Sequence, residues 1–457
     1  MMTPRSLYAI APHLSRAECE AITKKVLGFS TADECRVTVN SGMRQNTRFA
    51  VNQISTAGDD YNASVNIRSV FGKKVASVSV NRLDDASLKA AVENSERIAR
   101  LAPDDPELMP ELPPQRYAEP IVWSDATASL EPEARAEAVR AVTEASRKAG
   151  LVSTGYLEAQ AGSGAVANNR GLFAYSRSTA TAYTTTVRTP DGTGSGWAGA
   201  SDNDFRRINP AVLAERAIEK ARRSANPVAI EPGRYTVVLE PTAVANLVQL
   251  IVGSLNARNA DEGRSFFSRA GGGNKIGEKV VDERVTLISD PLDPRVPANT
   301  FGGDGMPNTR VTWIENGVVR NLAYDRFWAQ KSGKEPSFAG GTLRMEGGSS
   351  SVEEMIASTE RGILVTRFWY IRGVDPRTIL FTGLTRDGTF LIENGKVTRP
   401  VKNLRYNESP IFMLNNLQMM GRPERVSASE SGGPGQAIMV PAIKARDFNF
   451  TSTSDAI

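Results

Sequence analysis

The spacing of hydrophobic residues over the first hundred positions predicts strands flanked by two helices. Apolar residues recur every three or four positions over 14–27, where Ser15 and Glu18 have the spacing of a helix-capping pair. Helical spacing returns over 84–101. Between them lie segments in which polar and apolar residues alternate, as they do in strands: 36–40, 49–54, 64–70 and 75–80. This order predicts a layered α+β arrangement of helices and antiparallel strands.

A proline-rich segment separates this region from a second one with similar patterning. Six prolines between residues 103 and 120 predict an extended linker. Helical spacing over 133–148 and 209–224 then flanks a Thr- and Tyr-rich stretch, 171–189, that predicts a strand pair. Two prolines and a glycine over 226–233 indicate another boundary. The predicted organisation is an N-terminal α+β domain over 1–102, a linker over 103–120, a central α+β region over 121–229 and a C-terminal domain over 230–457.

The C-terminal part is predicted to be β-rich with one long helix. Residues 235–239 have the composition of a buried strand, and helical spacing over 242–260 follows Pro241, a residue typical of a first helical turn. Asn-Gly pairs at 316–317 and 394–395 predict tight hairpins, because these residues adopt the positive φ values that such turns require. The predicted fold class is α+β: an N-terminal α/β-layer region with antiparallel sheets, followed by a β-rich C-terminal domain built round one long core helix. The apolar face of that helix consists of Val244, Leu247, Val248, Ile251 and Leu255.

Composition restricts the chemistry more than it restricts the fold. The chain has 457 residues, two cysteines and a single histidine, His13. A zinc site with two or three histidines cannot be built from one such chain, and a Ser-His-Asp or Cys-His unit would have to use His13. The acidic pairs and glycine-rich segments lack the spacing of calcium or phosphate loops. The residues by themselves therefore predict no particular reaction.

Bulk properties predict a cytoplasmic protein. Cys19 and Cys35 are too few for a disulfide framework and are expected to be free thiols in a reducing compartment. The first apolar run is too short for a secretory signal, and no segment reaches the about 20 apolar residues of a bilayer span. With 55 basic and 51 acidic residues, the net charge of +4 is small for this length. We therefore expect no membrane and no nucleic-acid partner.

Several segments resemble the TldD/PmbA (TldE) family of metallopeptidases. The region from Cys35 to Ile98 resembles the first domain of that family, and the likeness covers nearly the whole chain. In the C-terminal domain it is carried by Val-Val-Leu-Glu-Pro at 237–241 with the helix after it, Glu-Gly-Arg-Ser-Phe at 262–266, Lys-Ile-Gly-Glu-Lys at 275–279, Asp-Gly-Met-Pro at 304–307, Leu-Ile-Glu-Asn-Gly-Lys-Val-Thr-Arg-Pro at 391–400 and Gly-Gln at 435–436.

The resemblance also implies where a zinc site would lie. In active members of the family, a His-Glu-x-x-x-His motif begins eight residues after the proline that ends the strand. A cysteine five residues before the glutamine of the late Gly-Gln completes the site. These positions are occupied here by Gln249, Leu250, Ser254 and Ser431. An amide and two hydroxyls are poor zinc ligands, and leucine cannot take a proton from water. The resemblance therefore implies a chain with no zinc, no other cofactor and no catalytic residues of its own.

This pattern matches the TldE-like role, a non-catalytic pseudo-peptidase subunit. Such a subunit pairs with a zinc-bearing TldD-like subunit, or self-associates, in a cytoplasmic complex that degrades or processes peptides. The chain alone is expected to be inactive. Segment 262–266 is closer to the catalytic branch, so a degenerate TldD-like chain is the other interpretation within the family. Two alternatives remain. One is a stand-alone peptidase or hydrolase that uses a carboxylate-bound metal or a serine, with Ser254 and Ser431 as the residues to test. The other is a binding or modulator protein, a role attached to this family through DNA gyrase.

Overall fold

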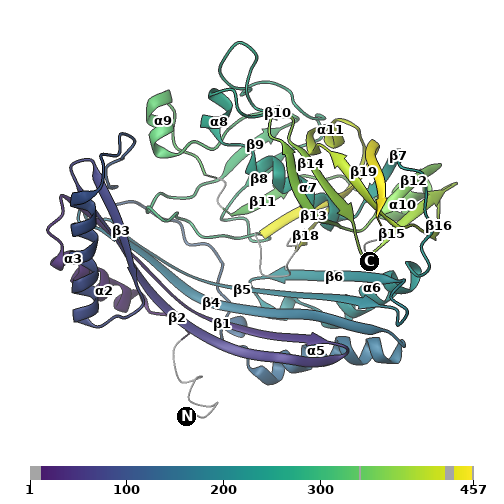
Figure 1. The fold of residues 1–457 in the computed structure, drawn as a ribbon, viewed down its shortest axis with the longest axis horizontal. Helices are drawn as coiled ribbons and strands as arrows, with labels where there is room; N and C mark the ends of the chain where they lie inside the picture. Colours follow the sequence, from purple (N-terminus) through teal and green to yellow (C-terminus); the bar gives the residue numbers. More distant parts are fainter. Residues whose placement is uncertain (1–11, 339–340, 428–436, 455–457) are drawn as a thin grey trace.

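The computed structural model describes residues 12–338, 341–427 and 437–454, and its first part is one curved antiparallel sheet (Figure 1). Six strands lie in the order β3-β2-β1-β4-β5-β6. Their bounds are β1 Glu34–Ala50, β2 Gln53–Phe71, β3 Lys74–Val80, β4 Val152–Asn168, β5 Phe173–Arg188 and β6 Ser195–Asp202. β1 pairs with β4 from Arg36 and Asn168 to Phe49 and Gly155. Strands from before and after the proline-rich segment therefore belong to the same sheet, while the predicted domain boundaries stay a prediction.

Helices cover one face of this sheet, and the alternation along β1 explains which face. Val37 and Val39 of β1 are buried in a cluster with residues of two helices, α2 and α3. Arg44 and Arg48 have the opposite parity and are exposed on the other face. Helix α2 begins with the predicted capping box of Ser15 and Glu18. The elements on the helical face and at the sheet ends are α2 Arg16–Phe29, α3 Asp85–Leu101, α4 Asp125–Ala128, α5 Pro132–Lys148, the 3-10 turn η1 Phe205–Arg207 and α6 Pro210–Arg223.

The strands are longer than the sequence pattern predicts. Residues 49–54, predicted as a strand, contain the turn between β1 and β2, where Val51 and Asn52 have φ values of 52° and 57°. Val51 continues the alternation through the turn and so conceals it. Residues 171–189, predicted as a strand pair, contain the single strand β5. Its run of Thr, Ser and Tyr offers no clear alternation from which one long strand could be predicted.

The proline-rich segment contains no helix or strand over residues 103–120, but it is fastened to both parts of the molecule. The buried carboxylate of Glu111 forms ion pairs with Arg36 at 3.4 Å and Arg68 at 2.6 Å, on β1 and β2. Glu107 forms an ion pair with Arg258 at 2.8 Å, across to the C-terminal part. These contacts give the segment a fixed course rather than that of a loose tether.

The C-terminal part is a second, larger sheet packed around helix α7. Its cluster of buried residues includes Val244, Leu247 and Ile251 of α7 together with Trp313 and Phe448 from the strands. The strands are β7 Gly233–Leu239, β8 Leu287–Ser289, β9 Val311–Glu315, β10 Val318–Val319, β11 Thr342–Met345, β12 Arg361–Val365, β13 Phe368–Asp375, β14 Leu380–Thr385, β15 Thr389–Glu393, β16 Lys396–Pro400, β17 Asn403–Glu408, β18 Leu417–Val426 and β19 Ala437–Ser454. The helices are α7 Pro241–Gly253, α8 Ala257–Asp261, α9 Arg326–Ser332, α10 Val352–Ala357 and α11 Pro410–Asn415. The predicted α+β fold class is confirmed.

The long helix predicted over 242–260 is wrong in one respect, because it is two helices. α7 ends at Gly253, with Ser254 at the C-cap, and α8 begins after Asn256. Glycine favours a helix end, and the Asn256 side chain caps the new helix by accepting a hydrogen bond from the Asn259 backbone N–H at 2.8 Å.

Both predicted Asn-Gly hairpins are confirmed. Asn316 and Gly317 have φ values of 49° and 77°, and Asn394 and Gly395 have 51° and 74°. They join β9 to β10 and β15 to β16.

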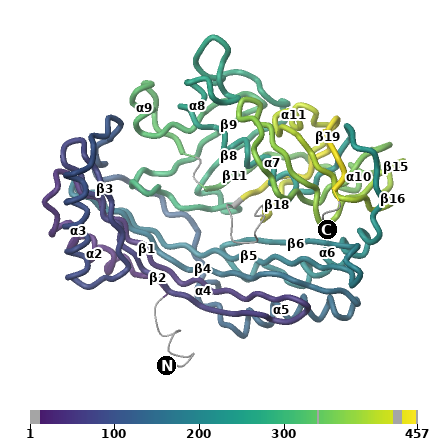
Figure 2. Tube along the Cα trace, in the orientation of Figure 1, coloured from purple at the N-terminus to yellow at the C-terminus, as the bar shows by residue number. Residues whose placement is uncertain are grey.

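The two sheets stack with the C-terminal part over the face of the curved sheet that α5 does not cover. Figure 1 shows the six strands as a long bowed band, with α5 beneath it and the C-terminal strands above. The Cα trace follows the same course, and α2 and α3 gather at the end of the band that lies away from the C-terminal part (Figure 2). Within the described residues, no helix is both long enough and apolar enough to cross a membrane.

Candidate functional site

The N-terminus of helix α7 is fixed from two sides. Glu240, at the N-cap position, donates its backbone N–H to the Val365 carbonyl at 3.1 Å. Its carboxylate forms an ion pair with Lys220 of α6 at 2.6 Å. Pro241 occupies the first turn, where its missing N–H leaves no broken hydrogen bond. The helix is thus held both by its own sheet and by a helix of the N-terminal part.

The three described positions from the predicted site lie at the C-terminal end of α7, and their polar groups bond to the helix itself. Gln249 and Leu250 are half-buried. The Gln249 side-chain amide donates to the Asn246 carbonyl at 3.5 Å, and the Ser254 hydroxyl donates to the Leu250 carbonyl at 2.8 Å. Ser431, the fourth position, lies outside the described residues.

These residues do not fit a zinc ion. A neutral amide and a hydroxyl already bound to a carbonyl are weak donors for Zn²⁺, which selects thiolate, imidazole and carboxylate. Across the described ranges, no group of three or more His, Cys, Asp or Glu is placed to hold a metal. The absence of a cofactor remains a prediction, because Ser431 is not among those residues.

The two cysteines and the single histidine of the chain, which are the residues that zinc prefers, lie elsewhere. Cys19 and Cys35 are both free and buried beneath the curved sheet. Burial raises the pKa of each thiol to about 11, so neither is a ready thiolate at neutral pH. The His13 ring packs edge-on against Trp123 at 4.8 Å between centroids, in the N-terminal part. None of the three is a part of α7 or of the strands that surround it.

A row of cavities lies on the face of the curved sheet that looks toward the C-terminal part. The first, which we call the small-residue cavity, has a volume of about 590 Å³. Its walls come from β1, β4 and β5 and from the C-terminal segment around Phe301. Gly42 and Gly162 face each other across the β1–β4 pair, and Ser178 of β5 lies beyond them. Small side chains there leave the floor of the cavity open.

The second cavity, the arginine cavity, has a volume of about 630 Å³ and adjoins the first at Arg44, which lines both. Strands β1, β4, β5 and β6 form its lower walls, and the segments beside β13 and β15 form the upper ones. The residues that give it its character are the arginines Arg44, Arg48, Arg188, Arg367 and Arg386, the aromatic residues Phe49, Tyr156, Trp197 and Trp369, and the acids Glu158 and Asp387.

Both acids of the arginine cavity are engaged. Glu158 is buried, forms an ion pair with Arg44 at 2.8 Å and accepts a hydrogen bond from it at 2.9 Å, and this contact raises the pKa of Arg44. Asp387 accepts a hydrogen bond from the Ser195 hydroxyl at 2.5 Å and pairs with Arg367 at 3.4 Å. Both carboxylates are therefore already paired with groups of the cavity wall.

A hydrogen bond connects α7 to this cavity. The side-chain oxygen of Asn246, which is buried in α7, accepts a hydrogen bond from the Phe368 backbone N–H at 3.1 Å. Phe368 begins β13, and its neighbours Arg367 and Trp369 both line the arginine cavity. The helix of the predicted site thus positions one wall of the cavity.

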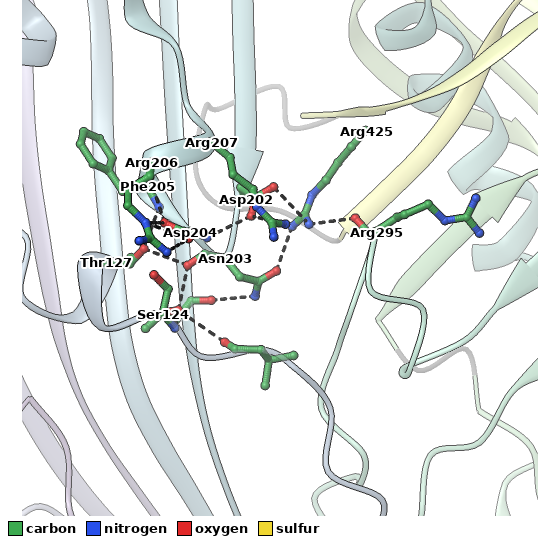
Figure 3. A network of polar contacts seen from close by, with 12 residues as sticks. Ser124, Thr127, Asp202, Asn203, Asp204, Phe205, Arg206, Arg207, Arg295 and Arg425 are labelled. Carbon is green, nitrogen blue, oxygen red and sulfur yellow. Dashed lines mark hydrogen bonds and ion pairs between the residues drawn. The ribbon is translucent and has the colours of Figure 1, made fainter.

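A polar network holds the C-terminal part against the end of the curved sheet (Figure 3). Arg425, near the end of β18, forms an ion pair with Asp202 of β6 at 3.5 Å. It also donates to the Asn203 side-chain oxygen at 3.1 Å and to the Arg295 carbonyl at 3.0 Å. Beside it, the bonds from Arg206 lower the pKa of Asp204 to about 2. The C-terminal part, which forms the roof over the cavities, is therefore held to the curved sheet by an ion pair and hydrogen bonds as well as by packing.

Sequence reasoning did not identify the residues of the arginine cavity. They come from segments that are more than three hundred positions apart, and none forms a motif with its neighbours. Arg44 and Arg48 fall between the strands predicted over 36–40 and 49–54, so their common face follows only from the full length of β1.

Sequence models of one family match three consecutive segments of the chain. PmbA/TldA metallopeptidase domain 1 matches residues 35–99, the central domain 125–225 and the C-terminal domain 232–452. A metalloprotease of Methanothermobacter thermautotrophicus is 26% identical over 251 residues, which are 50% of this chain and 52% of that protein. A metalloprotease TldD homolog of Haemophilus influenzae is 26% identical over 273 residues, 55% of each. The chain thus spans about half the length of the curated relatives it matches.

Two solved structures share the fold over almost the whole chain. TldE from Thermococcus kodakarensis matches with a TM-score of 0.82 and 20% identity, covering 95% of this chain and 100% of that one. A Thermotoga maritima protein, described as a candidate modulator of a DNA gyrase, matches with a TM-score of 0.83 and 18% identity, again covering 95% and 100%. At such identities the likeness shows the fold.

Proposed function

Because this chain belongs to the TldD/PmbA (TldE) metallopeptidase family, as its sequence predicted, we propose that it is a non-catalytic subunit of a peptidase complex. Its partner would be a zinc-bearing TldD-like subunit in the cytoplasm, and the pair would degrade or process peptides. One observation supports the proposal: α7 is anchored and packed, yet among the described residues Gln249 and Ser254 at its end bond to the backbone of that helix. We propose that the scaffold for a metal site is kept while its ligands are lost.

The cavities supply what such a subunit could contribute. A peptide can lie extended over the small-residue cavity, where Gly42 and Gly162 leave the sheet surface open. Binding through the peptide backbone tolerates many sequences, which suits a complex that processes peptides. This chain would hold the substrate, and its partner would cut it.

A stand-alone hydrolase at Ser254 has less support from the geometry. A serine nucleophile needs a base that takes its proton. Among the described residues, the Ser254 hydroxyl has the Leu250 carbonyl as its hydrogen-bond partner, and a carbonyl cannot serve as that base. We therefore prefer the subunit.

The test is a peptide-cleavage and zinc assay on three samples: this chain, a TldD-like partner, and the two mixed. We expect no stoichiometric zinc and no cleavage from this chain alone, and cleavage from the mixture that exceeds that of the partner alone. Full activity of the partner without this chain would contradict the proposal, as would cleavage by this chain alone.

A second experiment restores the predicted ligands. The variant Gln249→His, Leu250→Glu, Ser254→His, Ser431→Cys should bind about one zinc ion per chain, because it supplies three N and S ligands and a base. The matched control lacks only Ser431→Cys and should bind zinc more weakly. Failure of the folded variant to bind zinc would show that these four positions do not form the family site.

A further inference from the structure

We propose that the arginine cavity binds the carboxylate groups of an acidic peptide whose chain extends into the small-residue cavity. The inference rests on the proposed function and deepens it, because it names the class of peptide that this chain would hold. Three features of the cavity support it: its positive charge, two arginines that stack on aromatic rings, and its continuity with the small-residue cavity.

The charge of the lining groups is strongly positive. Among the described lining residues, arginines outnumber carboxylates by five to two. The two carboxylates, Glu158 and Asp387, are each bound to an arginine of the same wall. A concave site lined by one sign of charge concentrates the field and attracts a ligand of the opposite sign.

Two arginines on opposite walls have no ion-pair partner in the part of the chain that the structure describes. Within the described residues, neither Arg48 of β1 nor Arg386, between β14 and β15, forms an ion pair. Each instead lies over an aromatic ring, Arg48 over Tyr156 at 5.6 Å and Arg386 over Trp369 at 5.8 Å. A stacked guanidinium is held in place while its N–H edge remains able to bind a carboxylate through two hydrogen bonds.

The ligand is inferred to be a peptide because the cavity continues along the sheet. The two cavities meet at Arg44 and together follow β4 from Thr154 to Val166. At about 3.3 Å per residue, those twelve steps span about 40 Å, which is the length of an extended peptide of about a dozen residues. A small anion such as free phosphate would fill only one end.

The experiment measures binding to the isolated chain, so it does not depend on a partner. The probes are three fluorescein-labelled twelve-residue peptides of Gly, Ser and one further residue. The first contains four Glu and has an amidated C-terminus. The second replaces every Glu with Gln, and the third has Gln but a free C-terminal carboxylate. Fluorescence anisotropy at low and high salt gives each dissociation constant.

We expect the Glu peptide to bind at least about tenfold more tightly than the amidated Gln peptide, with the difference shrinking at high salt. Tighter binding by the third peptide alone would assign the site to a C-terminal carboxylate. Equal binding of all three would overturn the proposal. Inorganic phosphate that displaces the Glu peptide at micromolar concentration would also overturn it, because the site would then be one for a small anion.

Variants locate the site. Arg48→Gln with Arg386→Gln should reduce the affinity for the Glu peptide about tenfold and leave that for the Gln peptide unchanged. The control is Arg97→Gln with Arg140→Gln, which removes the same charge from exposed positions on α3 and α5 and should have little effect. An equal loss in both double variants would overturn the assignment. If peptide binding fails while the mixed subunits still cleave, only this inference falls; if binding succeeds without activation of a partner, only the subunit role falls.

Discussion

The end of helix α7 and the arginine cavity are linked through Asn246, but they treat their polar groups in opposite ways. At the end of α7, the Gln249 and Ser254 side chains bond to backbone carbonyls of the same helix. In the cavity, the guanidinium groups of Arg48 and Arg386 lie over aromatic rings, and their N–H groups remain able to bind a ligand. Self-satisfied groups are typical of a structural element, whereas held but unpaired donors are typical of a binding site. This difference is the basis of our proposal that the chain binds peptide and does not cleave it.

The largest expected effect is on stability, and it distinguishes a core position of α7 from a vacated site position on the same helix. Leu247→Ala should lower the free energy of unfolding by about 2–5 kcal/mol, because Leu247 is fully buried in the core. Gln249→Ala, two residues on, should change it by about 0.5 kcal/mol or less. Chemical denaturation measures both. A large loss from Gln249→Ala would mean that this position has a role that the structure does not explain.

The link between the two regions should have the next largest effect. Asn246→Leu removes the oxygen that accepts the Phe368 backbone N–H and leaves that donor buried. We expect a loss of about 1–3 kcal/mol in unfolding free energy, with weaker peptide binding, because β13 forms a wall of the cavity. Asn246→Asp, which keeps the acceptor, is the matched variant and should retain more of the binding. Unchanged peptide binding by Asn246→Leu would show that α7 does not position the wall of the arginine cavity.

The Asp204–Arg206 pair beside the polar network should make stability depend on pH. The pKa of Asp204 is lowered to about 2 by its bonds to Arg206, so its contribution is present above the unfolded-state pKa of about 4 and is lost as the pH falls toward 2. Asp204→Asn should therefore lower stability by about 1 kcal/mol at pH 7, because it removes the charge from the bonds to Arg206, and by progressively less between pH 4 and 2. Thermal melts of both proteins across this range would show it. A difference that is constant with pH would contradict the lowered pKa.

The smallest effect concerns the stability of the cavity variants. Arg48→Gln with Arg386→Gln should change the unfolding free energy by about 0.5 kcal/mol or less, because neither arginine is in an ion pair with a residue that the structure describes. The same double variant is expected to lose about tenfold in peptide affinity, so these two arginines would contribute to binding and not to stability. A stabilised double variant would support mutual repulsion in the cavity, and a strongly destabilised one would make these arginines structural.

Local signals in the sequence predicted much of the fold, while the length of the strands escaped them. The capping pair at Ser15 and Glu18 and the Asn-Gly hairpins act within a few residues, so their outcome does not depend on distant parts. The alternation of β1 and β5 is obscured because buried positions carry polar side chains, such as Gln45 and Thr47 of β1 and Thr181 of β5. Only the assembled structure shows that these polar residues are buried.

The candidate site divides in the same way. The resemblance to a family pointed to Gln249, Leu250 and Ser254, because they are close together in sequence and follow one strand and one proline. The arginine cavity could not be predicted, since Arg48 lies on the curved sheet and Arg386 between β14 and β15, and they line one cavity only when the C-terminal part covers the curved sheet. A break at Gly253 was also missed, because the apolar pattern continues across it to Leu255.

The most direct test of the account is the cleavage kinetics of the mixed subunits with two variants of this chain. With Gln249→Ala and Ser254→Ala, the account predicts kcat and KM equal to those of the unmodified pair, because α7 takes no part in bond cleavage. With Arg48→Gln and Arg386→Gln, it predicts a KM for an acidic peptide about tenfold higher at nearly the same kcat. Loss of kcat in the first variant, with the protein folded and paired, would contradict the account.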